Sequence, residues 1–220
     1  MTDIRVLFAT AIVDTSAWLA DQRPALEQSF DRPSVLAQFS VRGLAGHLRR
    51  AMTSVETYLD RPGPAPGPGP VVDVISAARY YATVATADAD LDSEFHRAIR
   101  QRGLEAAPGS PVDFVLDWGE TAGALIGRLE REPSDRLVQV YGDLVLTLDD
   151  YLVTRLIELV VHADDLAASL GVDPPALPPE ATGLVVATLV EVARIRHGDG
   201  AVVRALTRRE RDSVEALRVL

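Results

Sequence analysis

The sequence predicts a mainly α-helical protein: a four-helix bundle with a small hairpin and a short α(+β) C-terminal extension. Apolar residues recur at helical spacing over several long segments, which is typical of helices with one buried face. Stretches rich in proline, glycine and charge separate these segments and indicate turns and linkers. The chain has 220 residues and is 47% hydrophobic, which is enough for one sizeable core with an appendage. We therefore expect a bundle over residues 1–171 and an extension over residues 172–220.

Two apolar stripes predict the first two helices of the bundle. The first helix is expected to end before Pro24, and its stripe consists of Ile4, Leu7, Phe8, Ala11, Trp18 and Leu19. The second helix is expected from about Val41 to Leu59, with Ser40 in the N-cap position. Its stripe consists of Val41, Leu44, Leu48, Met52, Val55 and Leu59.

The middle of the chain predicts a linker and two more helices. Residues 61–70 are too rich in proline and glycine for a helix or a central strand, so we expect a semi-rigid surface linker there. A third helix is predicted over residues 75–102, with a break near residues 88–92 as an alternative. A fourth helix is predicted over residues 112–131.

A hairpin and a small extension flank the last bundle helix. Residues 138–148 form a short apolar run that a Gly-Asp pair interrupts, which indicates a small hairpin that could act as a lid or rim. After Gly171, a proline-rich segment ends the bundle. A helix over residues 180–196 and a short tail over residues 214–220 are expected to make up the extension.

Charge and hydropathy exclude several classes of partner. The formal net charge is −10 and the isoelectric point is near 4.8, whereas a nucleic-acid interface needs a basic stripe to bind phosphate. No apolar run reaches the roughly 18 residues of a membrane span, and the N-terminus lacks the features of a signal peptide. We therefore expect a cytoplasmic monomer or homodimer with neither a nucleic-acid nor a membrane partner.

The chain contains no cysteine. It cannot form a disulfide, a cysteine-based zinc site or a thiolate nucleophile of its own. Any thiolate that takes part in its chemistry must therefore arrive as a cosubstrate.

An acid and an imidazole, Glu158 and His162, lie four residues apart in the last bundle helix. At about 100° per residue, their side chains point only roughly 40° apart around the helix axis. The helix is apolar over most of its circumference, and a buried carboxylate is costly unless a cation, a proton or strong donors accompany it. Two interpretations remain open at this point: a shared divalent metal, or a buried His–Glu hydrogen bond.

A metal site would need a further ligand, and the chain offers three other histidines. His47 lies at the edge of the apolar stripe of the second helix, whereas His96 and His197 lie among charges or beside glycines and are expected to face solvent. Two histidines and one carboxylate leave open coordination positions, as catalytic metal sites do. Zinc is the first choice of metal, with nickel, manganese or iron as alternatives. Asp165 could orient the His162 imidazole as a hydrogen-bond acceptor.

The motif R-x-x-E-x-x-x-H-x-x-D-L, which begins at Arg155, together with a histidine in the second helix, resembles a known family. This is the mycothiol-dependent maleylpyruvate isomerase family, within the superfamily of DinB-like metal-binding four-helix bundles. The resemblance covers roughly residues 1–171. It implies that His47, Glu158 and His162 are metal ligands, and that mycothiol or a similar low-molecular-weight thiol is the cosubstrate.

Two arginines are candidates for contact with a substrate. The resemblance implies that Arg79 lies near the substrate, because it matches an arginine that family members use there. The alternative is a surface arginine that opens a helix. Arg155 could pair with a substrate carboxylate through its guanidinium fork, or could hold a salt bridge beside the metal ligands.

The resemblance favours an enzyme in which a metal-activated thiol attacks an electrophilic small molecule, as an isomerase or a thiol transferase. Two alternatives from other classes remain: a metal-dependent hydrolase that uses bound water, and a non-catalytic metal-binding scaffold. Thiol-dependent turnover would separate the first two of these three functions.

Overall fold

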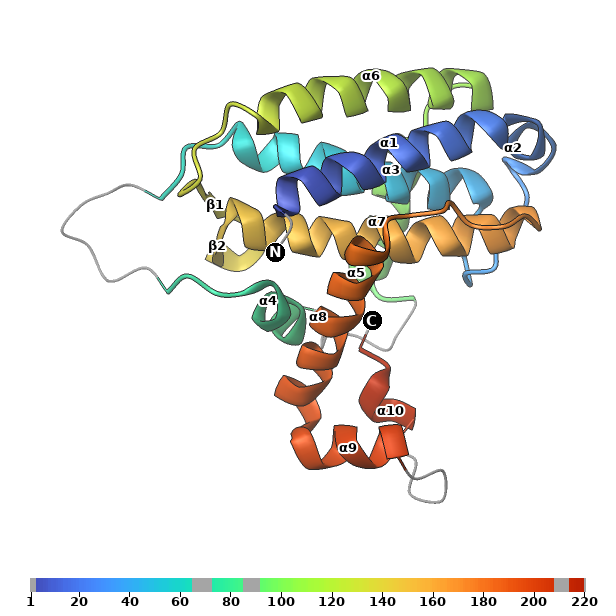
Figure 1. Cartoon of the computed structure of the whole chain (residues 1–220). Coiled ribbons are helices and arrows are strands. Elements are labelled where there is room, and N and C mark those ends of the chain that lie inside the picture. Colours follow the sequence, from blue (N-terminus) through green and yellow to red (C-terminus); the bar gives the residue numbers. More distant parts are fainter. Residues whose placement is uncertain (1–2, 65–72, 85–91, 208–213, 220) are drawn as a thin grey trace.

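Four long helices form the bundle that the sequence predicts (Figure 1). The computed structural model describes residues 3–64, 73–84, 92–207 and 214–219. Within these residues, the bundle helices are α1 (Ile4–Asp21), α3 (Val41–Leu59), α6 (Pro111–Leu129) and α7 (Leu148–Leu170). Both α1 and α3 pack against α6 and α7, so each of the four has at least two neighbours in the bundle.

Shorter elements surround the bundle. Helix α2 (Arg23–Ser29) follows α1, α4 (Ala77–Val84) packs against α7, and α5 (Glu94–Glu105) packs against α3. The strands β1 (Leu137–Gln139) and β2 (Val145–Thr147) pair antiparallel, with the 3-10 turn η1 between them at residues 141–143. The small hairpin predicted before the last bundle helix is thereby confirmed.

The described residues of the extension form helices only. They are α8 (Pro179–His197), α9 (Asp199–Thr207) and α10 (Val214–Leu217). Figure 1 shows α8 running away from the bundle beside α4, and α9 and α10 at its far end. Helix α8 packs against both α4 and α7. The division into a bundle and an extension at residue 171 stays a prediction.

Apolar side chains from all four bundle helices meet in one core. Burying apolar surface contributes about 25 cal/mol per Å² removed from water, so these side chains, and not polar groups, supply most of the stability of the bundle. None of the described helices is both long and apolar enough to cross a membrane. Among the largest fully buried side chains are Trp118, Tyr151, Phe8, Phe114, Ile12, Leu19, Leu44, Leu48, Met52 and Leu125.

The helices differ from the sequence prediction in three places. The third predicted helix is two helices, α4 and α5, because Ser93 caps a new helix by accepting a hydrogen bond from the His96 backbone N–H. The predicted break near residues 88–92 lies, except for residue 92, outside the described residues. Helix α2 was not predicted, and it holds Pro24 in its first turn, where the missing N–H has no partner to lose. Helix α9 was not predicted either, because it follows directly on the glycine that ends α8.

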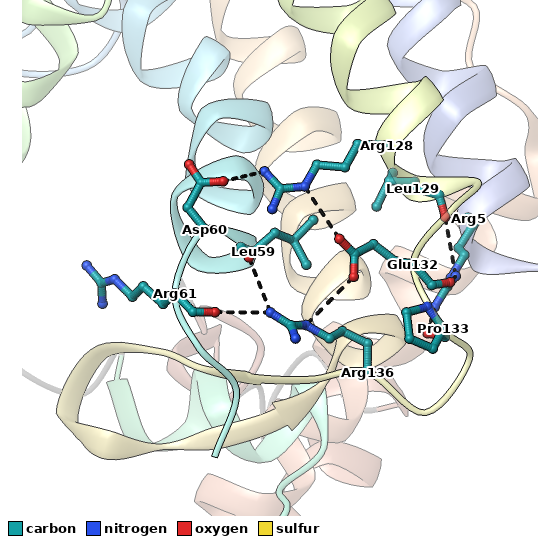
Figure 2. A network of polar contacts seen from close by, with 9 residues as sticks. All are labelled: Arg5, Leu59, Asp60, Arg61, Arg128, Leu129, Glu132, Pro133 and Arg136. Atoms are coloured by element: carbon teal, nitrogen blue, oxygen red, sulfur yellow. Dashed lines mark hydrogen bonds and ion pairs between the residues drawn. The ribbon is translucent and has the colours of Figure 1, made fainter. Parts of the chain in front are cut away.

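An ion-pair network fixes the loop that joins α6 to the hairpin (Figure 2). Glu132 lies between two arginines, with its Oε1 3.4 Å from Arg128 Nε and its Oε2 3.7 Å from Arg136 Nε. Arg136 also donates through Nη2 to the backbone carbonyl oxygens of Leu59, at 3.2 Å, and Arg61, at 3.0 Å. The start of the hairpin is therefore tied to the C-terminal end of α3.

Glycines allow α3 and α5 to approach closely. A Cβ atom added at Gly103 of α5 would lie 2.5 Å from the Gly43 carbonyl oxygen of α3, and one added at Gly46 would overlap the Gly103 carbonyl oxygen. Only residues without a side chain fit at this crossing. The contact positions His47, which follows Gly46, and Arg102, which precedes Gly103.

We expect Gly46→Ala to lower the free energy of unfolding by about 1–3 kcal/mol. Alanine is favoured over glycine by about 1 kcal/mol in a helix interior. Here the added methyl group meets a backbone carbonyl, which cannot move without shifting α5. Urea denaturation followed by circular dichroism measures the change.

Gly119→Ala is the matched control, because Gly119 is exposed in α6 and an added Cβ would have nothing within 4 Å. It should raise the free energy of unfolding by about 0.5–1 kcal/mol. Equal stabilisation by both substitutions would contradict the close approach of α3 and α5.

Candidate metal centre

Two neighbouring helices bring two histidines and one glutamate together. His47 lies on α3, and Glu158 and His162 lie one turn apart on α7. One potential ligand atom from each residue lies within 4.8 Å of the other two, and this is the group among the described residues that could hold a metal ion. The three side chains are 19%, 20% and 18% exposed, so the group lies at the edge of the core and is open to solvent on one side.

The distances between the ligand atoms suit a divalent ion. Glu158 Oε2 lies 3.2 Å from His162 Nε2 and 3.6 Å from His47 Nε2. The two imidazole rings meet edge to face, with centroids 4.6 Å apart. Zinc lies about 2.0–2.2 Å from nitrogen and oxygen ligands, so ligand atoms around one ion are roughly 3–4 Å apart. The residue types and their spacing therefore fit a metal held by Oε2 and the two Nε2 atoms.

The two histidines are oriented in different ways. Asp165 Oδ2 lies 3.0 Å from His162 Nδ1, so this carboxylate occupies one ring nitrogen and directs the other, Nε2, at Glu158. The ring of His47 packs against Phe39, with the centroids 6.0 Å apart. The buried Nδ1 of His47 has no hydrogen-bond partner among the residues that the structure describes.

The second oxygen of Glu158 has partners of its own. The Tyr81 hydroxyl, on α4, donates to Oε1 at 2.7 Å, and Arg155 Nη2 lies 3.8 Å from the same atom. Tyr81 is buried, and its hydroxyl also lies 3.0 Å from the Thr154 carbonyl oxygen. Tyr81 and Arg155 therefore hold Oε1 of Glu158 in place, while Oε2 faces the two histidines. Tyr81 is not predictable from the sequence as a partner of Glu158, because it lies on a helix that is remote from Glu158 in the chain.

The extension supports the helix that carries Tyr81. Arg196, near the end of α8, donates through Nη2 to the Tyr81 backbone carbonyl oxygen at 2.7 Å. Through Nη1 it donates to the Val219 carbonyl oxygen at 2.9 Å. A single guanidinium group thus links the C-terminal end of the described chain to α4.

Burial and neighbouring charges oppose each other at the three ligands. Burial disfavours the charged form of His162, but hydrogen bonds to Asp165 and Glu158 outweigh it and raise the pKa of His162 to about 9. Burial, aided by the charge of His162, lowers the pKa of His47. Burial also acts to raise the pKa of Glu158, but both histidines and Arg155 hold that pKa well below its ordinary value. Without a metal, the group is a carboxylate with one protonated and one neutral imidazole.

Two adjoining cavities open beside this group. The smaller has a volume of about 160 Å³ and is lined by His47, Glu158 and Arg155, among others. The larger, of about 500 Å³, extends to the hairpin, where Tyr141 of η1 lies on its wall. A volume of roughly 300–1,000 Å³ is typical of small-molecule sites. Five residues line both cavities: Arg50, Ser54, Tyr80, Ile99 and Arg102.

The structure separates the two arginines that the sequence singled out. Arg155 lines the smaller cavity, 3.8 Å from Glu158. Arg79 is exposed on α4 and is not among the residues that line either cavity, so its role near a substrate stays a prediction. His197 is exposed, and the Nδ1 of half-buried His96 lies 3.1 Å from the Ser93 hydroxyl. Neither of these histidines joins the metal centre.

The fold and this group of ligands define a class of protein: a helical bundle whose facing helices could hold a divalent ion beside a small-molecule cavity. The family model of the mycothiol maleylpyruvate isomerase N-terminal domain matches residues 14–167, more than half of the chain. The chain therefore belongs to that family, and its bundle is consistent with the DinB-like superfamily. Neither the curated proteins nor the solved structures give a match.

We expect His47→Ala and Glu158→Gln each to abolish tight zinc binding while the bundle still folds. The apolar stripes supply the burial energy, and loss of one ligand leaves a small polar group at the edge of the core. Metal content after zinc loading and dialysis, with circular dichroism as the check on folding, measures both effects. His197→Ala is the control, because it removes an exposed histidine outside the group. Full zinc content in the ligand variants, or no zinc uptake by the wild type, would show that the three residues form a polar cluster and not a metal site.

We also expect zinc affinity to rise by about tenfold per pH unit between about pH 7 and 8.5. His162 carries a proton below its pKa of about 9 and must lose it to become a ligand, whereas the lowered pKa of His47 leaves that imidazole neutral. Calorimetric titration in buffers of different ionisation enthalpy should show release of about one proton per zinc ion. Asp165→Asn should lower the pKa of His162 and flatten the slope. An affinity independent of pH in the wild type would refute this account.

Proposed function

We propose that this protein is a metal-dependent enzyme in which a low-molecular-weight thiol attacks an electrophilic small molecule, in an isomerisation or an S-transfer. The observation that carries the proposal is the group of His47, Glu158 and His162. Two of its members, His47 and Glu158, line the smaller cavity, which adjoins one that is large enough for a small molecule. Membership of the mycothiol maleylpyruvate isomerase N-terminal domain family supports mycothiol, or a related thiol, as the cosubstrate.

The three ligands leave coordination positions open. His47 and His162 supply one nitrogen each, and Glu158 supplies Oε2, because Tyr81 and Arg155 hold its other oxygen. We infer zinc as the ion, with nickel, manganese or iron as alternatives that accept the same ligands. A divalent ion bound there would lower the pKa of a coordinated thiol and so supply thiolate at neutral pH.

The absence of cysteine explains why the thiol comes from outside. The chain has no sulfur nucleophile of its own, so the reacting thiol must enter through the cavity. In an S-transfer, the carbon–sulfur bond forms as the leaving group departs with its electron pair, and the thiol proton passes to solvent. In an isomerisation, the thiol adds to a double bond and leaves again after rotation about the resulting single bond. In both cases the chain has to bind the thiol and the electrophile side by side.

Arg155 is the better placed of the two arginines for contact with a substrate. Its guanidinium lies over the Tyr151 ring, 5.1 Å from the centroid, and its Nε donates to the Thr154 hydroxyl at 3.1 Å. These contacts fix the Arg155 guanidinium on the wall of the smaller cavity. There it can pair with Glu158 and with a substrate carboxylate at the same time. Arg79 would need α4 to move before it could do the same.

We expect the zinc-loaded protein to convert an electrophile only when a thiol is added. The substrate panel should include maleylpyruvate and a simple alkylating electrophile, each assayed with and without mycothiol. Glu158→Gln should lower the rate by at least about 100-fold, because it removes an anionic ligand that touches both histidines.

The metal-free protein is the control. It gives the rate at which the thiol and the electrophile react without metal-dependent catalysis. Undiminished turnover in thiol-free buffer would contradict the proposal and favour a hydrolase in which metal-bound water is the nucleophile. Zinc binding without turnover of any member of the panel would favour the non-catalytic scaffold.

A further inference from the structure

Arginines line both cavities beside the metal centre, although the protein as a whole is acidic. Arg50 and Arg102 lie on the walls of both cavities, with Arg61 added in the larger and Arg155 in the smaller. Among the described residues, the larger cavity is lined by no aspartate or glutamate, and the smaller by the metal ligand Glu158 alone. Because the formal net charge of the chain is −10, this positive wall is a local feature.

A cavity elsewhere on the molecule shows the contrast. It lies between α1, α7 and α8, and its volume of about 680 Å³ is comparable with that of the larger cavity beside the metal centre. Its charged lining residues are all acids: Asp3, Asp149, Asp150 and Glu180. Basic residues are thus concentrated where the proposed chemistry takes place.

The guanidinium groups of Arg50 and Arg102 have no acceptor among the residues that the structure describes. In the described part of the chain, neither guanidinium forms a hydrogen bond or an ion pair, whereas Arg49, one position away, donates to the Ala106 carbonyl and the Thr121 hydroxyl. Burial and the nearby charges of Arg102 and Arg155 lower the pKa of Arg50. Like charges held close together without a carboxylate between them favour the binding of an anion.

Two neighbouring helices bring these arginines to the walls of the same cavities, close to the candidate metal ligands. Arg50 lies one turn after His47 on α3, and Arg102 lies on α5 at the glycine crossing with α3. Ile99 and Tyr80 line the same part of both cavities and offer apolar contacts. A ligand whose anionic group meets both arginines would therefore place its body beside the metal ligands.

We propose that Arg50 and Arg102 form an anion-binding subsite for a small organic substrate that carries two negative charges. Each guanidinium can hold a carboxylate or phosphate through two parallel N–H···O bonds, so a pair of them suits a dianion. Assigning this dianion to the electrophilic substrate rests on the proposed function. The binding itself needs neither metal nor thiol.

The test is direct binding to the metal-free protein. Chelators are themselves polyanions, so they are removed by dialysis before the titration. Calorimetric titration at low ionic strength compares succinate, inorganic phosphate and acetate. We expect one of the two dianions to bind at least about tenfold more tightly than acetate, because a single charge cannot engage both guanidinium groups fully. Preference for succinate identifies the recognised group as carboxylate, and preference for phosphate identifies it as phosphate; either result supports the subsite.

Substitutions then locate the binding. Arg50→Ala and Arg102→Ala should each lower the affinity for the preferred dianion by about 10- to 100-fold, because each substitution removes a charge-assisted hydrogen bond. Arg102 is exposed, so its variant keeps the fold even if the half-buried Arg50 proves less tolerant. Arg23→Ala is the charge-matched control: Arg23 is exposed on α2, where it pairs with Glu27 at 3.6 Å. The affinity of the Arg23→Ala variant for the dianion should stay within about twofold of that of the wild type.

Three results would overturn the subsite. These are the absence of dianion binding to the wild type, acetate binding as tight as that of the dianions, and dianion binding that both site variants retain. Thiol-dependent turnover is measured separately with the zinc-loaded protein, so a failure of the subsite and a failure of the proposed function can be told apart.

Discussion

The partly buried carboxylate of Glu158 is the constraint on which the candidate metal centre and its surroundings depend. A carboxylate that loses most of its contact with water must be compensated, and removing one partner of a buried charge costs far more than the pair contributes. The compensation here comes from three helices: the imidazoles of His47 on α3 and His162 on α7, the guanidinium of Arg155, and the hydroxyl of Tyr81 on α4. His47 and Tyr81 can reach the carboxylate only if α3 and α4 pack against α7 at one rotation. The polar centre and the apolar core thus determine the same arrangement of helices.

The charge around the candidate metal centre differs in sign from the charge of the whole protein. The protein is acidic overall, and its field extends only about 8–10 Å into a solution of physiological ionic strength. An anion therefore gains no attraction from the molecule at long range, and any gain arises where Arg50, Arg102 and Arg155 lie close to it. Under the proposed function, a neutral thiol would not compete for these guanidinium groups. The thiol and an anionic electrophile would then occupy neighbouring parts of the cavities without excluding each other.

Periodicity within single helices made part of this architecture predictable. The four bundle helices follow from apolar stripes, and the spacing of Glu158 and His162 on one helix face follows from helix geometry alone. His47 was identified because the chain has few histidines and this one lies beside an apolar stripe. Which arginine faces a cavity depends on the rotation of its helix, and packing between helices that are distant in sequence sets that rotation. For this reason Arg79 was singled out from sequence, while Arg50 and Tyr81 emerged only from the three-dimensional structure.

The link from Arg196 to the Tyr81 backbone carbonyl has an evolutionary consequence. The family match ends at residue 167, yet Arg196 lies well beyond that point and braces α4, whose Tyr81 hydroxyl contacts the Glu158 carboxylate. Proteins that share the bundle and its ligands but carry a different C-terminal extension would hold α4, and with it one wall of the cavity, in a different position. Under the proposed function, exchange of the extension would change which substrates fit, because it would reshape the cavity while the three candidate metal ligands stay the same.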